Sequence, residues 1–162
     1  MKSAIRVLFV GASAGYLAGQ VMDKATTWYY ERQSDASKQR EQELLPEGAP
    51  LASARKLAGL VGAEPTDDQA GTIAQAMHQS LGQLYGVVAA ALTRRGVSPM
   101  AAGVASGMGG FLLVDELANG LFFTPPPQAY PVESHLRGVV GHLTLGVTMG
   151  ALLTVARRLR LL

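Results

Sequence analysis

Four long stretches of the sequence contain no Asp, Glu, Lys or Arg: residues 7–22, 69–93, 96–114 and 138–156. Three of them are 19 residues or longer, and about 20 apolar residues suffice to cross the hydrocarbon core of a bilayer. A soluble helical bundle would instead place charged residues regularly along the outer side of each helix. The pattern therefore predicts an all-α integral membrane protein, a four-helix bundle, rather than a soluble bundle.

Composition agrees with this prediction once the position of the charges is considered. Residues 24–68 hold 14 of the 26 charged residues, which lowers the mean hydropathy to +0.18 and hides the apolar stretches. The length of 162 residues fits a single membrane domain, 1–162. The absence of cysteine excludes disulfides and thiol chemistry, and a net charge of +2 without a long basic run argues against nucleic-acid binding.

The predicted spans are residues 4–28, 69–93, 99–122 and 136–157, with an extramembrane connector over 29–65. The aromatic run Trp28-Tyr29-Tyr30 would lie at a water interface. A cleaved signal peptide competes with the first span, because Ala12-Ser13-Ala14 resembles a cleavage site. The apolar run continues past that site to Met22, which favours an uncleaved span.

The connector is expected to contain one short helix. Pro50 to Val61 has an apolar side and ends at Gly62, so this helix would lie on the bilayer surface or dock on the bundle. The polar residues 31–49 suit either a helical extension or an irregular loop. Thr66 and Gln69 form a capping box that begins the second span.

Basic residues predict the orientation. With four spans, the two termini and the 94–98 turn share one side of the membrane. That side carries Lys2, Arg6, Arg94, Arg95, Arg157, Arg158 and Arg160. The other side has the connector, with six bases against eight acids, and a nearly uncharged turn over 123–133. The positive-inside rule therefore predicts a multi-pass inner-membrane protein with both termini in the cytoplasm.

The chain also repeats a pattern of glycines and ionisable residues. Gly11, Gly15 and Asp23 have the same spacing as Gly103, Gly107 and Asp115. His78, Gly82, Gly86 and Arg94 have the same spacing as His142, Gly146, Gly150 and Arg158. The pattern predicts two helical hairpins related by a pseudo-two-fold axis along the membrane normal, with any site at their interface.

The repeat predicts a buried polar layer in the outer half of the bundle. Eight residues separate the outer end of three spans from their ionisable residue, which is about 12 Å at 1.5 Å per residue. The members of the layer are Asp23, His78, Asp115, Glu116 and His142. Charged groups at such depth are costly, so they are expected to face the interior and pair.

The matched glycines predict where the helices touch. Lipid supplies no hydrophobic drive between helices, so close backbone contact at small residues must hold them together. These helix-packing positions are Gly11, Gly15, Gly82, Gly86, Gly103, Gly107, Gly146 and Gly150. The expected partners are the lipid bilayer and other membrane-protein subunits or a second copy of the chain.

Residues 111–150 resemble a known family. Asp115-Glu116, the TPPP turn at 124–127 and the run from Pro131 through Glu133, His135 and Arg137 to His142 look like the YagU-like group of small bacterial inner-membrane proteins. That resemblance implies a helical inner-membrane protein and supplies no reaction.

Three functions remain open from these residues. The first is a non-enzymatic structural or accessory subunit, in which Asp–His contacts only fix the register of the helices. The second is proton or cation handling, because histidine titrates near neutral pH beside carboxylates at the same depth. The third is a di-metal enzyme, disfavoured because Gln75 and Val139 stand where a Glu-x-x-His motif needs glutamate. No metal and no cofactor is therefore expected.

The outer mouth of the bundle is expected to hold His135 paired with Glu133, with an entrance relay as the alternative. Arg137, near Glu133, would be an interfacial anchor, and Tyr85 below His78 would serve packing.

Overall fold

The computed structural model describes the backbone from Lys2 to Leu162 and side chains from Ala4 onward, so the Lys2 side chain used in the topology prediction lies outside it. Within this part of the chain every regular element is helical. The elements are α1 (Lys2–Arg32), α2 (Asp35–Leu44), α3 (Ala49–Gly59), α4 (Asp67–Arg94), α5 (Pro99–Gly110), the π-helix η1 (Phe111–Phe123), the 3₁₀-helix η2 (Pro127–Ala129) and α6 (Val132–Arg158).

Local sequence signals set the helix ends. The Thr66 hydroxyl accepts from the backbone N–H of Gln69 and the Gln69 side chain accepts from that of Thr66, so the predicted capping box begins α4. Gly96, with φ +98°, follows α4, and Gly62, with φ +74°, follows α3. Glycine adopts such left-handed backbone at no steric cost, which explains why both helices stop there.

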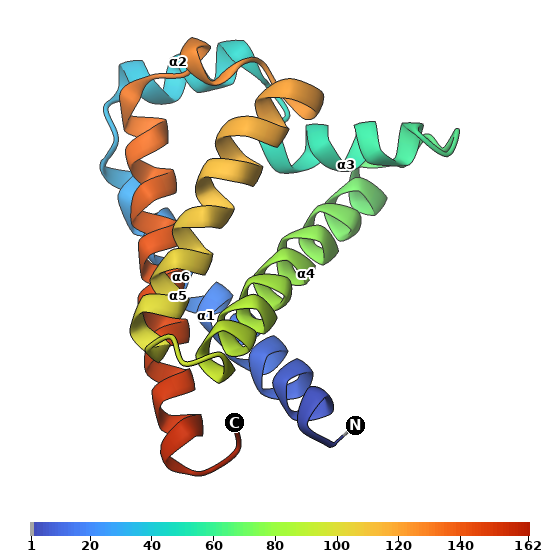
Figure 1. The fold of residues 1–162 in the computed structure, drawn as a ribbon. Coiled ribbons are helices and arrows are strands. Elements are labelled where there is room, and N and C mark those ends of the chain that lie inside the picture. Colours follow the sequence, from blue (N-terminus) through green and yellow to red (C-terminus); the bar gives the residue numbers. More distant parts are fainter. Residues whose placement is uncertain (1) are drawn as a thin grey trace.

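The long helices pack in a cycle of neighbours (Figure 1). α1 packs on α4, α5 packs on α6, and the two pairs join through contacts of α1 with α6 and of α4 with α5. Both chain ends and the α4–α5 turn lie at the lower end of Figure 1, here called the termini end. α2, α3 and η2 lie at the opposite, connector end.

Three helices are long and apolar enough to cross a membrane: Ala4–Arg32, Pro99–Phe123 and Val132–Arg158. These correspond to the first, third and fourth predicted spans. The helix of the second predicted span, α4, is not among the three, and its sequence carries four glutamines and His78.

Several element boundaries differ from those predicted. α1 continues past the aromatic residues to Arg32, whose guanidinium donates to the Trp28 carbonyl and lies 4.3 Å from the centre of the Trp28 ring. α6 begins at Val132, four residues before the predicted fourth span, because the rigid Pro131 precedes it. The polar residues after α1 form a helix of their own, α2, capped by the Ser34 hydroxyl.

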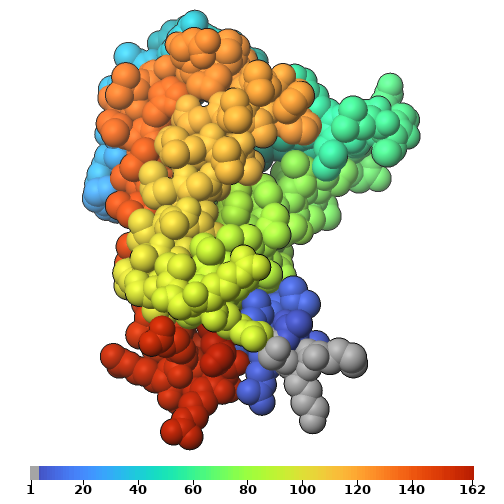
Figure 2. All heavy atoms as spheres, in the orientation of Figure 1, coloured from blue at the N-terminus to red at the C-terminus, as the bar shows by residue number. Residues whose placement is uncertain are grey.

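The short connector helix docks on the other helices. α3 packs against the beginning of α4 and against η1, and it buries Ala52, Ser53, Ala54 and Ala58. Figure 2 shows its far end projecting from the side of the molecule. Docking on the other helices, one of the two predicted arrangements, is therefore present.

Each predicted glycine pair brings two backbones together. A Cβ atom added at Gly15 would overlap the carbonyl oxygen of Gly82, and one added at Gly86 would overlap that of Gly11. In α5, a Cβ atom at Gly103 would overlap the Gly146 carbonyl oxygen and lie 2.6 Å from the Gly150 nitrogen. One at Gly107 would lie 2.5 Å from the His142 carbonyl oxygen. The helices could not approach this closely with any larger residue.

The third predicted span is not a uniform α-helix. Its second half, η1, is a π-helix of 13 residues that contains both Asp115 and Glu116. A π-helix bonds each residue to the fifth rather than the fourth along the chain, so its side chains follow a wider turn, and such segments are frequent at functional sites.

Candidate functional site

The first acid–imidazole pair joins α1 to α4. Nε2 of His78 lies 2.8 Å from Oδ1 of Asp23. The Asp23 backbone carbonyl also accepts a hydrogen bond from the Thr26 hydroxyl, which ties the next turn of α1 to the same place. Two members of the predicted polar layer are therefore in contact.

The second pair joins η1 to α6. Nε2 of His142 lies 2.9 Å from Oδ2 of Asp115, and Nδ1 lies 3.0 Å from the carbonyl oxygen of Gly107 on α5. The rings of Tyr85 and Phe111 pack around the imidazole, with centroids 6.1 and 5.9 Å from its own. His142 is therefore held on every side by apolar or hydrogen-bonding neighbours.

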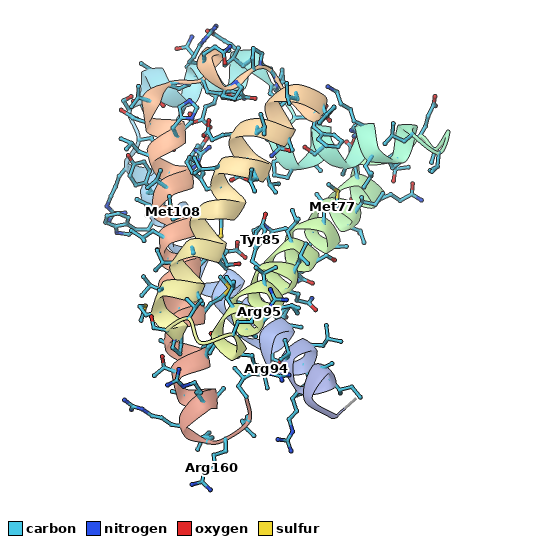
Figure 3. The ribbon with its side chains drawn as sticks, in the orientation of Figure 1. Met77, Tyr85, Arg94, Arg95, Met108 and Arg160 are labelled. Atoms are coloured by element: carbon cyan, nitrogen blue, oxygen red, sulfur yellow. The ribbon has the colours of Figure 1, made fainter. Side chains whose placement is uncertain are left out.

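A cavity of about 80 Å³ lies between the two pairs. His78, Asp115 and His142 line it, together with Tyr85 and apolar residues of α1, α4 and α6. Figure 3 shows Tyr85 on the side of α4 that faces α5. Its hydroxyl is buried and has no hydrogen-bond partner among the described residues. A cavity of this size with four polar groups on its wall has room for water, which would supply the missing partner.

Glu116 does not belong to the predicted layer. Its Oε1 lies 2.7 Å from Nδ1 of His135, while Nε2 of His135 lies 3.0 Å from the Pro127 carbonyl oxygen. The two adjacent acids thus pair with different histidines of α6, which stand seven residues and two helical turns apart. Successive side chains of η1 point in different directions, and Glu116 points to the connector end.

The predicted pairing of His135 with Glu133 is wrong, because the His135 imidazole is hydrogen-bonded to Glu116 instead. Glu133 instead accepts a hydrogen bond of 2.8 Å from the backbone N–H of Ser34, at the start of α2. Arg137, expected near Glu133 as an interfacial anchor, turns toward α2, and its Nη2 lies 2.8 Å from Oε2 of Glu41.

Glu41 is the centre of a polar cluster between α2 and α6. Three side chains donate to its carboxylate: Gln33 at 2.7 Å, Ser134 at 2.7 Å and Arg137 at 2.8 Å. Burial by itself would raise the pKa of Glu41, but these hydrogen bonds and the positive charge outweigh burial and hold the pKa below its usual 4.5. The cluster fixes the connector onto the helices.

The predicted layer is only partly buried. The His142 side chain is 4% exposed, but those of Asp23, His78 and Asp115 are 43%, 41% and 41% exposed. The cause is the direction of α4, which packs on α5 and then diverges from η1 toward the connector end (Figure 1). One side of the two pairs is therefore left without a covering helix.

Two further cavities continue from the pairs to the connector. One of about 160 Å³ contains Asp115, Glu116 and His135 in its wall and shares Arg137 and Tyr130 with a larger one of about 550 Å³. The larger cavity lies among Tyr30, Glu41 and the α2–α3 segment. Toward the termini end, buried apolar side chains such as Leu145, Met149 and Leu153 close the interior. The polar groups therefore lie between this apolar packing and the connector end.

The residues described bring together no cluster of three or more His, Asp or Glu that could hold a metal ion. What the arrangement can do is hold and exchange protons between paired carboxyl and imidazole groups. Sequence reasoning missed Glu41 and Gln33, because nothing in the connector sequence distinguishes them from other polar residues. It also assigned Tyr85 to packing, although the tyrosine lines the central cavity.

Comparisons with family models, with curated proteins and with solved structures found no match to this chain. The resemblance of residues 111–150 to the YagU-like group therefore stays a prediction, and the fold and site are the basis for function.

Proposed function

We propose that the chain is a multi-pass protein of the bacterial inner membrane, as the YagU-like resemblance implies, and that it has four spans and both termini in the cytoplasm, as the uncharged stretches and the basic residues indicate. In this proposal α4 crosses with the three more apolar helices, covered by α1 on one side and α5 on another. The matched glycine contacts and Asp–His pairs of the two hairpins support a pseudo-two-fold bundle closed by a glycine zipper. Its function would be that of a non-enzymatic accessory subunit, binding another membrane protein or a second copy of itself.

One observation carries the accessory function: the exposure of Asp23, His78 and Asp115 on helices that would lie in lipid. Polar groups at membrane depth are costly unless they face protein or a water-filled cavity. A partner helix placed between α4 and η1 would cover all three. Its contact would also shield large apolar side chains of η1 that are more than half exposed, among them Leu113 and Leu117.

Native mass spectrometry of the protein extracted in mild detergent tests this function. The expected result is a stoichiometric complex, with another protein or with a second copy. A photo-crosslinking residue at Met77, on the half of α4 nearer the connector (Figure 3), should capture the same partner. The control position is Phe9, exposed on α1 nearer the termini end. A monomer in the spectrum and no capture at Met77 in cells would contradict the proposal.

Proton or cation handling is the second candidate, favoured by the adjoining cavities lined by Glu116, His135, Asp115 and His142. Asp115→Asn and His142→Ala separate the two candidates. If the pairs only join helices, these variants lose assembly. If the pairs handle ions, the variants stay folded and assembled but lose a proton- or cation-dependent signal in proteoliposomes.

A further inference from the structure

Both ring nitrogens of His142 are engaged with oxygen atoms. Nδ1 faces the Gly107 carbonyl oxygen at 3.0 Å and Nε2 faces the Asp115 carboxyl at 2.9 Å, in a side chain that is 4% exposed. A backbone carbonyl can only accept a hydrogen bond. Nδ1 must therefore carry a hydrogen.

This hydrogen decides the protonation of the whole pair. A neutral imidazole with hydrogen on Nδ1 presents a lone pair at Nε2. An ionised Asp115 would then place two acceptors 2.9 Å apart with nothing between them. The contact requires a second hydrogen, either on Nε2, as imidazolium beside carboxylate, or on Asp115, as carboxylic acid beside neutral imidazole. Both forms contain one proton more than a neutral histidine beside an ionised aspartate.

His135 and Glu116 repeat this arrangement with the nitrogens exchanged. Nε2 faces the Pro127 carbonyl oxygen at 3.0 Å, and Nδ1 faces the carboxyl of Glu116 at 2.7 Å. His78 differs, because only its Nε2 is engaged, with Asp23. A neutral His78 that donates from Nε2 satisfies this contact, so no additional proton is needed there.

We propose that the His142–Asp115 pair is a proton-binding site, which the Gly107 carbonyl keeps occupied by one proton while the pair is in contact. The inference does not depend on the accessory function, because it follows from the three groups alone. The other titratable groups that face His142 are Tyr85 and, across the cavity, His78 with its partner Asp23, all from α1 and α4. The α1 residues in the cavity wall, Gly19 and Met22, are not titratable, and α5 contains no titratable residue. Loss of the proton leaves one hydrogen for two acceptors, so that His142 must give up either the Gly107 carbonyl on α5 or Asp115 on η1, and proton occupancy is coupled to the packing of these helices.

Asp115→Asn provides a matched variant. The carboxamide can donate an N–H to Nε2 while Nδ1 still donates to Gly107, so both hydrogen bonds can persist with one proton fewer. Nitrogen-15 NMR of histidine-labelled protein near neutral pH reads the protonation of each ring nitrogen, and carbon-13 NMR reads the carboxyl of Asp115. The three histidines are assigned with His78→Gln and His135→Gln, which leave the His142 pair intact.

The wild type should show either two protonated nitrogens on His142 or a protonated Asp115 carboxyl. In Asp115→Asn, His142 should become a neutral ring protonated on Nδ1 alone. Asp23→Asn should leave the His142 signals unchanged. A neutral His142 beside an ionised Asp115 in the folded wild type would overturn the proposal, whether or not the protein is found in a complex.

Discussion

Gly11 of α1 and Gly86 of α4 meet backbone to backbone, so that a Cβ atom added at Gly86 would overlap the carbonyl oxygen of Gly11. The contact lies on the termini side of the Asp23–His78 pair, on the same two helices. The glycine contact and the Asp23–His78 hydrogen bond therefore both require the same alignment of α1 along α4. If the glycine contact is lost, the helices must separate and the hydrogen bond between Asp23 and His78 must stretch.

Gly86→Ala should accordingly destabilise the protein by about 1–3 kcal/mol, the usual cost of forcing extra atoms into a packed contact. Gly71→Ala on the same helix is the control, because its added Cβ would meet nothing within 4 Å. Alanine forms helix better than glycine, so this control should be neutral or slightly stabilising. Thermal unfolding in detergent measures both, and equal melting temperatures would contradict the packing described.

The α5–α6 contact predicts the same behaviour in the second hairpin. Gly103→Ala should lower the melting temperature, because its Cβ would overlap the Gly146 carbonyl oxygen. Gly109→Ala, also on α5, meets nothing within 4 Å and is the matched control. A substitution at Gly103 that proved as mild as that at Gly109 would show that the helices lie farther apart.

The depressed pKa of Glu41 predicts a pH dependence for the docking of α2 on α6. Because the folded pKa lies below the unfolded value near 4.5, the ionised carboxylate stabilises docking above that pH. The stabilisation is lost as the pH falls through the folded pKa. The protection of α2 amides, which is their exchange rate relative to the intrinsic rate at the same pH, should therefore fall when the protein is acidified below about pH 4.5.

Glu41→Gln should reduce the protection of the α2 amides already at neutral pH. The free energy of local opening should fall by about 2 kcal/mol, the usual value of a hydrogen bond to a charged group. Glu43→Gln is the control, because Glu43 is exposed and its contacts with Arg40 and Gln39 lie within α2. Protection of α2 that is insensitive both to pH and to Glu41→Gln would contradict the role of this cluster.

The number of membrane crossings can be measured directly because the chain has no cysteine. A cysteine at Gln39 in α2 should react with an impermeant maleimide in intact cells from which the outer membrane has been removed. A cysteine at Val97, in the α4–α5 turn, should react only after the cells are opened. Labelling of both positions from outside would show that α4 does not cross the membrane. Labelling of Val97 alone would show that the orientation is the reverse of the one proposed.

Much of the arrangement could be predicted from spacing. Glycines four residues apart and a histidine four residues before them lie on one helical face, so the spacing predicts that these residues share the packing surface of their helix. The same reasoning could not assign Glu116, because adjacent side chains of a helix point in different directions and depth along the helix does not say which neighbour each one meets. Glu116 contacts His135 and not the layer that contains Asp115.

The partners of connector residues could not be predicted in the same way. Glu41 and Arg137 are 96 residues apart, and no periodic pattern links a polar connector to the start of a distant helix. The contact exists because α1 extends to Arg32 and α2 then turns back over α6, a path set by where the helices end. Exposure of Asp23 and His78 likewise depends on the angle between α4 and η1, which no local spacing encodes.

The sequence by itself determined that this chain forms helices, where α3 and α4 begin and end to within about two residues, and which glycines share a helical face with His78 or His142, because these properties depend on neighbours within a few turns. Only the tertiary structure decided which histidine each adjacent acid meets, how α2 closes over α6, and that one side of the Asp–His pairs stays uncovered. Those outcomes depend on helix directions and on the wider turn of η1, which arise from the packing of the whole chain.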